Sequence, residues 1–172
     1  MRIDLTHCSI RNWREDDLDR LVRLADNRKI WLALRDRFPS PYTRDAGKEW
    51  LGVVLAASPP TTFVIAVEDQ LAGSIGIIPG TDIYARTAEV GYWLGEEYWG
   101  RGLAAEALNG FAPWVFEEFK LARLWAAVFV NNPGSARVLE KAGFVREATF
   151  KNAAVKDGHV IDEWIYARTP PA

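Results

Sequence analysis

Side chains that bind metals or form disulfides are scarce in this chain. Its 172 residues include one cysteine, Cys8, and two histidines, His7 and His159. A single cysteine cannot form a disulfide within the chain or a cysteine cluster for a metal. Two histidines are too few for a zinc site unless carboxylates supply most of the ligands. We therefore expect no metal ion and no disulfide within the chain.

Long apolar runs and an excess of basic residues are also missing. No segment approaches the roughly 18 uncharged apolar residues of a membrane-spanning helix, and residues 1–4 lead into no apolar run typical of a secretory signal. The chain has 21 Lys and Arg residues against 23 Asp and Glu residues, with a formal net charge of −2. A nucleic-acid-binding surface usually shows a basic stripe, so this balance disfavours one. We expect a cytoplasmic protein that binds neither membranes nor nucleic acid.

Apolar and aromatic residues are abundant instead. Hydrophobic residues make up 49% of the chain, and eight residues are tryptophans. A chain of this length folds by default as one domain and buries on the order of 70% of the surface that the unfolded chain exposes. We expect a single domain over residues 1–172.

The first third of the chain has the pattern of three helices. Acidic residues followed by a 3.6-residue apolar period predict a helix from about Asp16 to Asp26. A second short helix is expected over Ile30 to Phe38, because the prolines that follow stop it. Thr43 is suited to cap a third helix, which ends before Ser58.

Runs with strand character follow. Thr61–Val67, Leu71–Ile78 and Thr87–Leu94 are joined by short connections, which favours antiparallel pairing. The run Leu124–Val130 is almost unbroken in its apolar character, which is the pattern of a strand buried on both faces. A helix precedes it and makes a crossover, so this strand should lie parallel to Thr87–Leu94.

The remaining elements complete the expected fold. A helix should run from Gly102 to about Glu118 with a bend at Pro113, and another from Gly134 to Ala142. Phe144–Val155 and Val160–Ala167 should form a hairpin across an Asp-Gly turn. The prediction is an α/β (α+β) fold with a mixed, mostly antiparallel sheet of about seven strands and helices on both faces.

The stretch from Glu89 to Glu106 joins a strand to a helix through a turn with two glycines, Gly100 and Gly102. Backbone N–H groups in the first turn of a helix have no partner inside it, and phosphate oxygens are their natural acceptors. Glycine lets a ligand approach the backbone closely, and Arg101 can add a bidentate contact to phosphate oxygens. The turn therefore predicts a phosphate-binding site.

Two familiar phosphate loops fit this turn poorly. No G-x-x-x-x-G-K-[ST] string is present, which excludes the Walker loop. Residues 100–105 do fit G-x-G-x-x-A, the dinucleotide fingerprint. That fingerprint begins directly after its strand and is followed by an acidic residue about 20 positions on. Here Gly95 to Trp99 intervene, and the next strand ends in Asn131-Asn132, so a dinucleotide site is the weaker alternative.

A third interpretation is acyl-coenzyme A. The turn resembles the [QR]-x-x-G-x-[GA] signature of the GNAT superfamily of N-acetyltransferases, and in particular its ribosomal-protein N-acetyltransferase-like branch. Glu97 stands where that family usually has Gln or Arg, and Gly100 and Gly102 match. The segment from Asn131 to Phe144 is similar to a second family motif, N-x-x-S-x-x-x-x-E-K-x-G-F. The resemblance covers roughly the last two thirds of the chain.

The resemblance implies acetyl-coenzyme A as co-substrate and a set of residues that bind it. In the family the pantetheine arm pairs with backbone at the end of the strand, as an added strand would, and the diphosphate lies on the glycine turn. An asparagine and a serine of the second motif also contact the coenzyme. The implied coenzyme-binding residues are Trp93, Leu94, Trp99, Gly100, Arg101, Gly102, Leu103, Ala104, Asn131 and Ser135.

Glu89 and Ser135 are the candidate catalytic residues. Amine acetylation needs a base to remove a proton from the ammonium, and Glu89 can do so directly or through a water. In a strand Glu89 shares one face with Gly91 and Trp93. Ser135 matches the family serine that donates a hydrogen bond to the departing sulfur, and a backbone N–H near Leu94 or at the following glycine would polarise the carbonyl. The structural alternatives are a glutamate that faces solvent or forms an ion pair, and a serine that caps its helix or lies in its first turn without a catalytic role.

The acceptor side is expected in the loop between the second and third helices. Residues 34–42 mix charge, aromatic rings and proline, and GNAT relatives place such a loop over the acceptor. The candidate acceptor-binding residues are Trp31, Arg35, Phe38 and Tyr42. Trp31, Trp93 and Trp164 are possible lining residues, whereas Trp50, Trp114 and Trp125 fit the core better.

The hypothesis is direct acetyl transfer from acetyl-coenzyme A to a primary amine, either a peptide N-terminus or a small molecule. A homodimer is plausible because the strands near the C-terminus carry aromatic residues. The alternatives are a sensor that binds acyl-coenzyme A without turnover and, less favoured, a dinucleotide-dependent enzyme.

Overall fold

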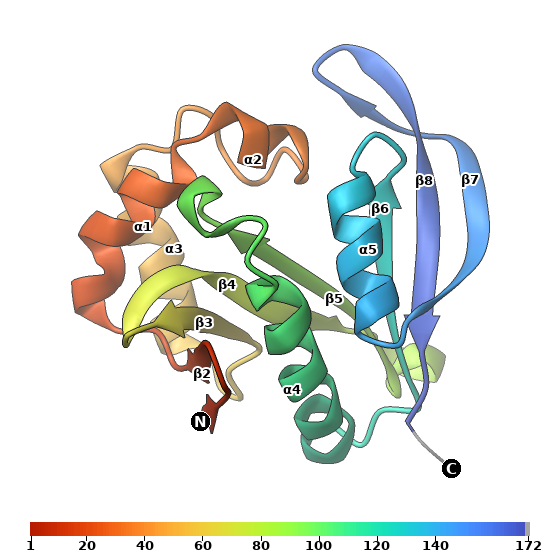
Figure 1. Ribbon diagram of the computed structural model, residues 1–172, viewed down its shortest axis with the longest axis horizontal. Helices are drawn as coiled ribbons and strands as arrows, with labels where there is room; N and C mark the ends of the chain where they lie inside the picture. Colours follow the sequence, from red (N-terminus) through yellow and green to blue (C-terminus); the bar gives the residue numbers. More distant parts are fainter. Residues whose placement is uncertain (171–172) are drawn as a thin grey trace. The chain divides into compact units, whose positions relative to one another are not determined.

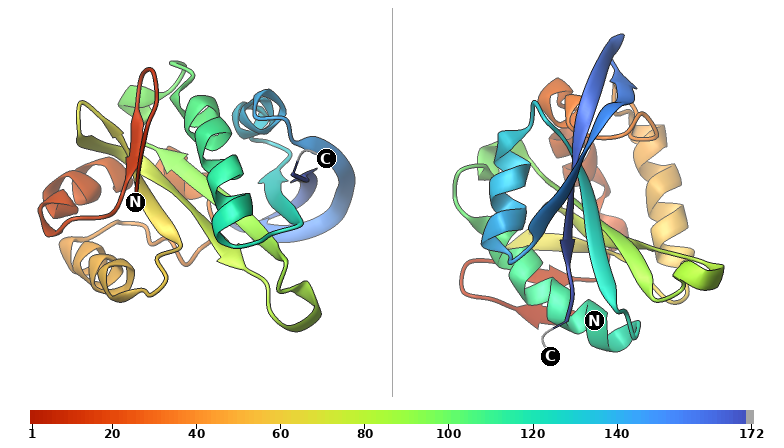
Figure 2. Two further views of the ribbon diagram at one scale, coloured as in Figure 1. Left: turned by 90° about the horizontal axis from the view of Figure 1, so that it is seen from below. Right: turned by 90° about the vertical axis from the view of Figure 1, so that its right-hand side faces the viewer.

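A computed structural model describes residues 1–170, and Figures 1 and 2 show its helices and strands. The helices are α1 (Leu18–Ala25), α2 (Arg28–Leu32), α3 (Arg44–Ala56), α4 (Leu103–Glu118) and α5 (Pro133–Lys141), with short 3₁₀ helices η1 (Glu15–Asp17), η2 (Asp82–Tyr84) and η3 (Glu96–Tyr98). The strands are β1 (Arg2–Asp4), β2 (Ser9–Arg11), β3 (Thr62–Val67), β4 (Gln70–Pro79), β5 (Thr87–Leu94), β6 (Arg123–Phe129), β7 (Val145–Lys156) and β8 (His159–Arg168). Within residues 1–170, no helix combines the length and apolar character needed to cross a bilayer.

The predicted fold class is confirmed. The eight strands form one mixed sheet in the order β1-β2-β3-β4-β5-β6-β8-β7. β5 and β6 run parallel, as the crossover through α4 predicts, whereas the pairs β1–β2, β2–β3, β3–β4, β6–β8 and β7–β8 are antiparallel. The sheet has eight strands rather than about seven because Arg2–Asp4 forms a short strand beside Ser9–Arg11.

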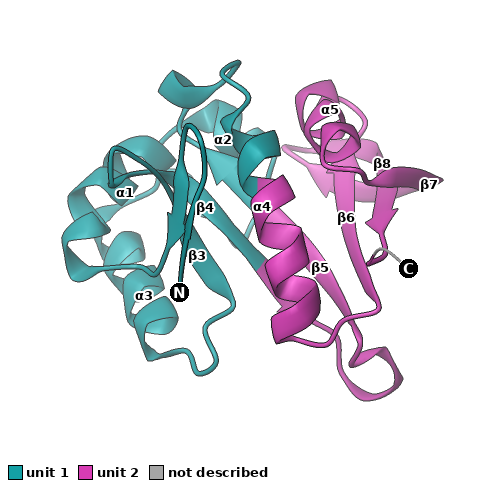
Figure 3. Ribbon diagram, turned by 60° about the horizontal axis from the view of Figure 1, so that its bottom comes forward, with its two compact units in different colours: residues 1–76, 92–107 teal, residues 77–91, 108–172 magenta. Residues whose placement is uncertain are grey.

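Two compact units divide the described residues (Figure 3). Unit 1 contains Met1–Gly76 and Tyr92–Ala107, and unit 2 contains Ile77–Gly91 and the described residues from Leu108 onward. β4, β5 and α4 each contribute residues to both units. The two units are described separately below.

In unit 1, helices α1 and α3 lie side by side on one face of β3 and β4 (Figure 2). Leu21 and Leu24 of α1 and Leu51 of α3 are buried, which is the result expected from their helical spacing. A Cβ at Gly47 of α3 would approach Val22 to 2.9 Å, so the small residue lets the two helices pack closely. Thr43 caps α3 as predicted, since its Oγ1 accepts from Ala46 N at 3.2 Å.

The second helix is shorter than its sequence pattern suggests. Asn27 caps α2 by accepting from Lys29 N at 2.8 Å, and the helix ends at Leu32. The prediction of a helix that continues to Phe38 is therefore wrong. The chain turns instead, with Phe38 N donating to the carbonyl of Arg35 at 2.9 Å. This turn frees the Phe38 ring to pack against an aromatic neighbour, as described below.

In unit 2, the helices cover one face of the strands (Figure 2). Leu124 and Ala126 of β6 are buried on that face, and the residue opposite Ala126 on β8, Tyr166, donates a hydrogen bond from its hydroxyl to Glu140 of α5 at 2.9 Å. Asn109 Nδ2 of α4 donates to the carbonyl of Lys141 at the end of α5 at 3.2 Å. Both helices therefore pack on the face of the strands that carries Leu124.

The opposite face of β6 corrects two predictions. Residues along β6 alternate between half-buried and buried up to Val128, and the residues of the opposite face, Trp125 and Ala127, are half-buried. The expectation of a strand buried on both faces is therefore wrong, as is the assignment of Trp125 to the core. The physical reason is that the helices of unit 2 pack on one face only, and an apolar side chain does not by itself show which face is covered.

Two adjacent alanines test this arrangement. Ala126→Asp places a carboxylate against the helices, without a partner, and should lower the free energy of unfolding by several kcal/mol. Ala127→Asp puts the same charge on the half-buried face, where water can solvate it, and should cost much less. Urea denaturation of both variants measures the difference. Equal losses would contradict the one-sided packing of β6.

Candidate active site

The turn after β5 has the geometry of an anion site. Gly100 and Gly102 have φ angles of +73° and +80°, in the left-handed region that glycine adopts without strain. Glu106 N donates to the carbonyl of Gly102 at 3.1 Å, which starts the hydrogen-bond series of α4. The N–H groups of residues 103–105 precede that bond and lack helical partners, at the positive end of the helix dipole.

Space is available next to both glycines. A Cβ built on Gly100 or on Gly102 would meet no atom within 4 Å apart from its neighbours in the chain, so a ligand can reach the backbone there. Arg101 lies between them, with its guanidinium carbon 5.6 Å from the centre of the Tyr98 ring. Trp99 is 44% exposed, and its indole Nε1 donates to the carbonyl of Leu94 at 2.8 Å. Donors, room and a cation therefore occur together in this turn, which fits a diphosphate.

Ion pairs fasten this turn to the first two helices. Glu97 binds Arg23 of α1 through both carboxylate oxygens, at 2.9 and 3.0 Å, and lies 3.9 Å from Arg20. The hydrogen bonds from Arg23 hold the pKa of Glu97 below its ordinary value. Glu96 pairs with Lys29 of α2, which likewise lowers its pKa. Glu97, which departs from the family pattern, therefore contributes an anchor.

Tyr98 adds a second attachment. Arg20 Nη2 donates to its hydroxyl, while Arg20 Nε donates to the carbonyl of Leu71 at 2.6 Å. Tyr98 is 7% exposed, so the ring beneath Arg101 is fixed by burial as well as by hydrogen bonding. A Cβ at Gly95 would come within 2.7 Å of Leu24, which shows how closely the start of the turn lies against α1.

The backbone of Gly95 is already occupied. Its N–H donates to the carbonyl of Ala72 at 2.9 Å. Of the two positions that sequence reasoning offered for polarising the thioester carbonyl, the glycine is therefore excluded in this conformation. The N–H near Leu94 is the remaining candidate.

The structure brings three aromatic rings together in unit 1. Phe38 lies 4.9 Å from Tyr42 and 5.7 Å from Trp93, measured between ring centres. Tyr42 is 5% exposed, and burial raises its pKa to about 12, so its hydroxyl stays protonated. Phe38 and Trp93 are half-buried, which makes them the surface of this cluster. The cluster joins a predicted acceptor loop to a predicted coenzyme-binding residue.

The other two candidates of the acceptor loop lie differently. Trp31 is half-buried under Arg28, whose guanidinium carbon is 5.2 Å from the ring centre. Arg35 is exposed, and its carbonyl closes the turn before Phe38. The part of Trp31 and Arg35 in acceptor binding stays a prediction.

In unit 2, Glu89 lies where the pairing of two parallel strands ends. The register of β5 and β6 pairs Thr87 with Arg123 and Glu89 with Trp125. Burial along β5 alternates, with Ala88 and Val90 buried and Glu89 half-buried, as the predicted strand face requires. Val90 and Gly91, the last β5 residues of this unit, follow the last residue of β5 that is paired with β6.

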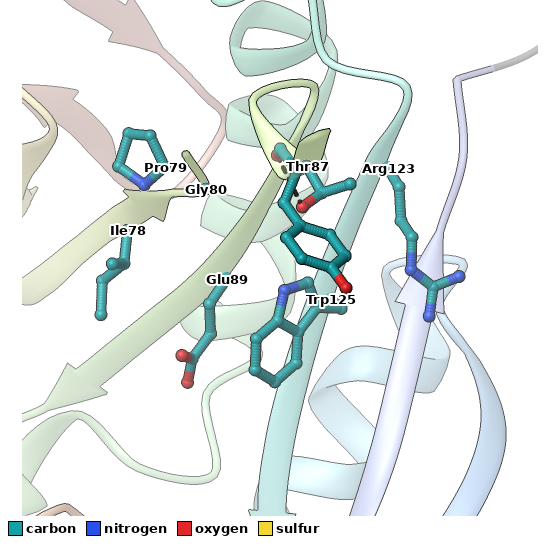
Figure 4. A pocket seen from close by; sticks show the side chains of 8 residues that line it. Ile78, Pro79, Gly80, Thr87, Glu89, Arg123 and Trp125 are labelled. Carbon is teal, nitrogen blue, oxygen red and sulfur yellow. Dashed lines mark hydrogen bonds between the residues drawn. The ribbon is translucent and has the colours of Figure 1, made fainter. Parts of the chain in front are cut away.

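A pocket of about 540 Å³ surrounds Glu89 (Figure 4). It lies at the end of β4, at the beginnings of β5 and β6 and at the turn with η2. The lining residues are Ile78, Pro79, Gly80, Tyr84, Thr87, Glu89, Arg123 and Trp125. Sequence reasoning missed all of these except Glu89. The signal that was available is the position of Trp125 two residues after Arg123, since alternate residues of a strand share a face and an arginine seldom faces a core.

The second motif places its polar residues at the start of α5. Asn132 is the N-cap, since its Oδ1 accepts from Ser135 N at 3.2 Å. Ser135 is half-buried in the first turn, and Asn131 is exposed just before the cap. Asn132 therefore caps α5, and Ser135 lies in the first turn of that helix, so its catalytic role stays a prediction. Among residues 1–170, no group of three or more His, Cys, Asp and Glu side chains is placed to hold a metal ion.

Comparison with known proteins points to one family. The family model described as an acetyltransferase (GNAT) domain matches residues 8–145. Probable N-acetyltransferase YjcK of Bacillus subtilis is 34% identical over 106 residues, which are 62% of this chain and 59% of that protein. The ribosomal-protein-serine acetyltransferase of Escherichia coli is 33% identical over 106 residues, with the same two shares. The matched segment thus spans less than two thirds of the length of these relatives.

Solved structures agree with this match. RimJ of Mycobacterium smegmatis, in complex with a coenzyme A disulfide, superposes with a TM-score of 0.85 at 26% identity. The similarity covers 98% of this chain and 86% of that one. The likeness therefore extends over the part of the sequence that these two relatives leave unmatched.

The pair between Arg23 and Glu97 gives a pH-dependent prediction. Because the folded protein lowers the pKa of Glu97, the pair contributes fully above the ordinary glutamate value of about 4.3 and is lost as the pH falls through the lowered value. Amide hydrogen exchange of residues 95–102, corrected for its intrinsic pH dependence, should therefore become faster as the pH falls below about 4.

A variant tests the same contact at neutral pH. Glu97→Gln should speed exchange in residues 95–102 by up to about fivefold, the upper range for an exposed ion pair. Glu118→Gln, at the exposed end of α4, is the control and should leave these residues unchanged. Exchange in Glu97→Gln as slow as in the parent protein would show that the ion pair does not hold the turn.

Proposed function

Because the chain belongs to the GNAT acetyltransferase family, whose domain model matches residues 8–145, we propose that it transfers an acetyl group from acetyl-coenzyme A to a primary amine. The observation that carries the proposal is the turn at Gly100 and Gly102, where left-handed backbone angles, open space and the first N–H groups of α4 coincide. We keep the expectation of one domain over residues 1–172.

The diphosphate of the coenzyme is assigned to this turn. N–H groups of residues 103–105, at the start of α4, can donate to its oxygens, and Arg101 adds a charged contact. Trp99 and Gly102 precede these donors in the chain. The anchors through Glu97 and Tyr98 keep the turn in its binding conformation before the ligand arrives, which lowers the ordering cost of binding.

The pantetheine arm is assigned to the end of β5, as a strand added to exposed backbone. The pairing of β5 with β6 in unit 2 covers Thr87 to Glu89, and backbone beyond a register is suited to hydrogen-bond an extended ligand. Trp93 and Leu94 would contact the arm from β5. Asn131 and Ser135 are assigned to the same arm from the start of α5, in line with the second family motif.

The reaction forms a bond between the amine nitrogen and the acetyl carbon and breaks the bond between that carbon and sulfur. Glu89 is assigned as the base that takes a proton from the ammonium, directly or through a water, since only the neutral amine is a nucleophile. The N–H near Leu94 is assigned to the developing oxyanion. Ser135 is assigned as the hydrogen-bond donor to the thiolate, which then takes a proton to leave as the thiol.

Direct transfer is preferred to a covalent acetyl-enzyme. Cys8 is 7% exposed, and burial raises its pKa to about 12. Its sulfur therefore stays a protonated thiol and is a poor nucleophile. Amine and acetyl-coenzyme A would accordingly have to be bound at the same time.

The acceptor is proposed to be a primary amine on a protein N-terminus or on a small molecule. The name of the Escherichia coli relative says that it acts on a ribosomal-protein serine, which supports a protein amine. Phe38, Tyr42, Trp31 and Arg35 remain the proposed contacts on the acceptor loop. A homodimer and the absence of nucleic-acid and membrane partners remain part of the proposal.

Removal of one cation tests the diphosphate assignment. Arg101→Ala should weaken coenzyme A binding about 10- to 100-fold, because a hydrogen bond to a charged group contributes about 1.5–3 kcal/mol. Pantetheine, which lacks the diphosphate, should bind the variant and the parent equally. Titration calorimetry with both ligands measures this, and equal losses for the two ligands would place the diphosphate elsewhere.

The base assignment has its own test. Glu89→Gln should lower kcat by about 100-fold or more, the usual contribution of a general base, while the Kd of coenzyme A stays the same. Glu118→Gln is the control and should retain both values. Coenzyme release is followed with a panel of amines and short peptides. A protein that binds acetyl-coenzyme A but releases no coenzyme with any acceptor would instead be a sensor.

A further inference from the structure

The pocket around Glu89 has an unusual balance of charge and apolar surface. Its walls are formed mainly by Ile78, Pro79, Tyr84 and Trp125, and Glu89 is the one carboxylate among the residues that line it. Resting on the proposed acetyl transfer, we propose that this pocket binds the acceptor and selects a primary amine whose neighbouring substituent is apolar. An arylalkylamine, or an N-terminus with a large apolar first residue, has this chemistry.

The carboxylate provides the contact for the ammonium. Glu89 projects from β5 beside Trp125, in the register that pairs these two residues (Figure 4). An ammonium next to a carboxylate and an aromatic face gains both charge pairing and cation–π attraction. The same carboxylate is the proposed base, so recognition of the ammonium and removal of its proton would occur at one group.

Among the lining residues that the structure describes, the one cation is directed away from the pocket. The guanidinium of Arg123 points away from Glu89 and Trp125 in Figure 4 and binds Glu147 of β7, with Nη1 2.9 Å from Oε1. Hydrogen bonding to Glu147 raises the pKa of Arg123 further, so the charge is permanent and already matched. A free amino acid would therefore bring a carboxylate for which the pocket has no available cation.

Polyamines are disfavoured for the converse reason. An amine such as spermidine carries further ammonium groups along its chain, and each needs an acceptor or water when it leaves solvent. Beyond Glu89, the pocket offers Ile78, Pro79 and two aromatic side chains in place of further carboxylates. A ligand with one positive charge and an otherwise apolar structure therefore matches the residues that line this pocket.

The turn with η2 fixes the outer wall. Gly80 N donates to the carbonyl of Thr87 at 2.8 Å, and Thr87 Oγ1 donates to the carbonyl of Tyr84 at 3.0 Å. A Cβ at Gly80 would lie 2.4 Å from that same Tyr84 carbonyl oxygen, so only glycine permits this approach. Tyr84 is thus held at the pocket although it is 63% exposed. A cavity of about 540 Å³ is ample for an aromatic ring on a two-carbon linker.

The test compares primary amines that differ in the substituent next to the amino group. Phenethylamine, spermidine and leucine are offered with saturating acetyl-coenzyme A, together with two peptides that differ only in beginning with Phe or Ser. Phenethylamine or the Phe peptide should exceed spermidine, leucine and the Ser peptide in kcat/KM by tenfold or more. Which of the two leads distinguishes a small molecule from a protein N-terminus. A preference for spermidine, leucine or the Ser peptide would overturn the proposal.

Neighbouring residues of η2 provide a matched pair of variants. Tyr84→Ala should raise the KM for the preferred acceptor about fivefold or more with little change in kcat. Ile83→Ala, next to it, 81% exposed and outside the lining, should change neither value. Both residues are exposed, so neither substitution threatens folding. Trp125→Phe keeps an aromatic wall and should retain most of the affinity. Equal KM values in Tyr84→Ala and Ile83→Ala would contradict the assignment of the pocket.

Binding separates failure of this inference from failure of acetyl transfer. If no amine is turned over, calorimetric titration of phenethylamine into the protein saturated with coenzyme A still reports on the pocket. Binding that is weakened by Tyr84→Ala and by Glu89→Gln, but not by Ile83→Ala, supports an amine site in a protein without turnover. Absence of binding under these conditions overturns the inference.

Discussion

The N–H groups at the start of α4 are useful to a ligand only while the turn before them keeps its shape. Two glycines in left-handed conformation produce that shape, and arginines of α1 hold it through Glu97 and Tyr98. The anion site therefore depends on packing in unit 1 as much as on the motif itself. A loop that ordered only on ligand binding would have to offset the conformational entropy of several residues.

Most elements follow from local patterns because their causes are local. The Asp-Gly turn between β7 and β8 has φ angles of +52° at Asp157 and +77° at Gly158, which is the conformation that this dipeptide favours in hairpins. Thr43 and Gly143 stand at the helix ends where their chemistry predicts them. The segment after Leu32 differs, because Phe38 packs against Tyr42, and Tyr42 lies beyond the residues whose helical pattern was used for the prediction.

The candidate site was predictable to a different degree in each part. The glycine turn could be located from the sequence because backbone chemistry forms it. The contacts of Glu97 could not, since Arg23 is far away in the sequence and no periodicity links the two residues. The pocket at Glu89 arises from the ends of three strands and a turn, and its tryptophan was assigned to the core because burial of β6 depends on where α4 and α5 pack.

This chain has Glu97 where the family usually has Gln or Arg, and this difference affects how related chains can vary. The acid at position 97 is stabilised by the base at position 23. If either residue lost its charge, the other would have lost its ion-pair partner. Reversing both charges re-forms the pair between positions 23 and 97 but brings a base beside Arg20, which lies 3.9 Å from Glu97, whereas reversing one charge removes the pair. Positions 23 and 97 should therefore change in concert among closely related sequences, so that a residue of the first helix evolves jointly with the coenzyme turn.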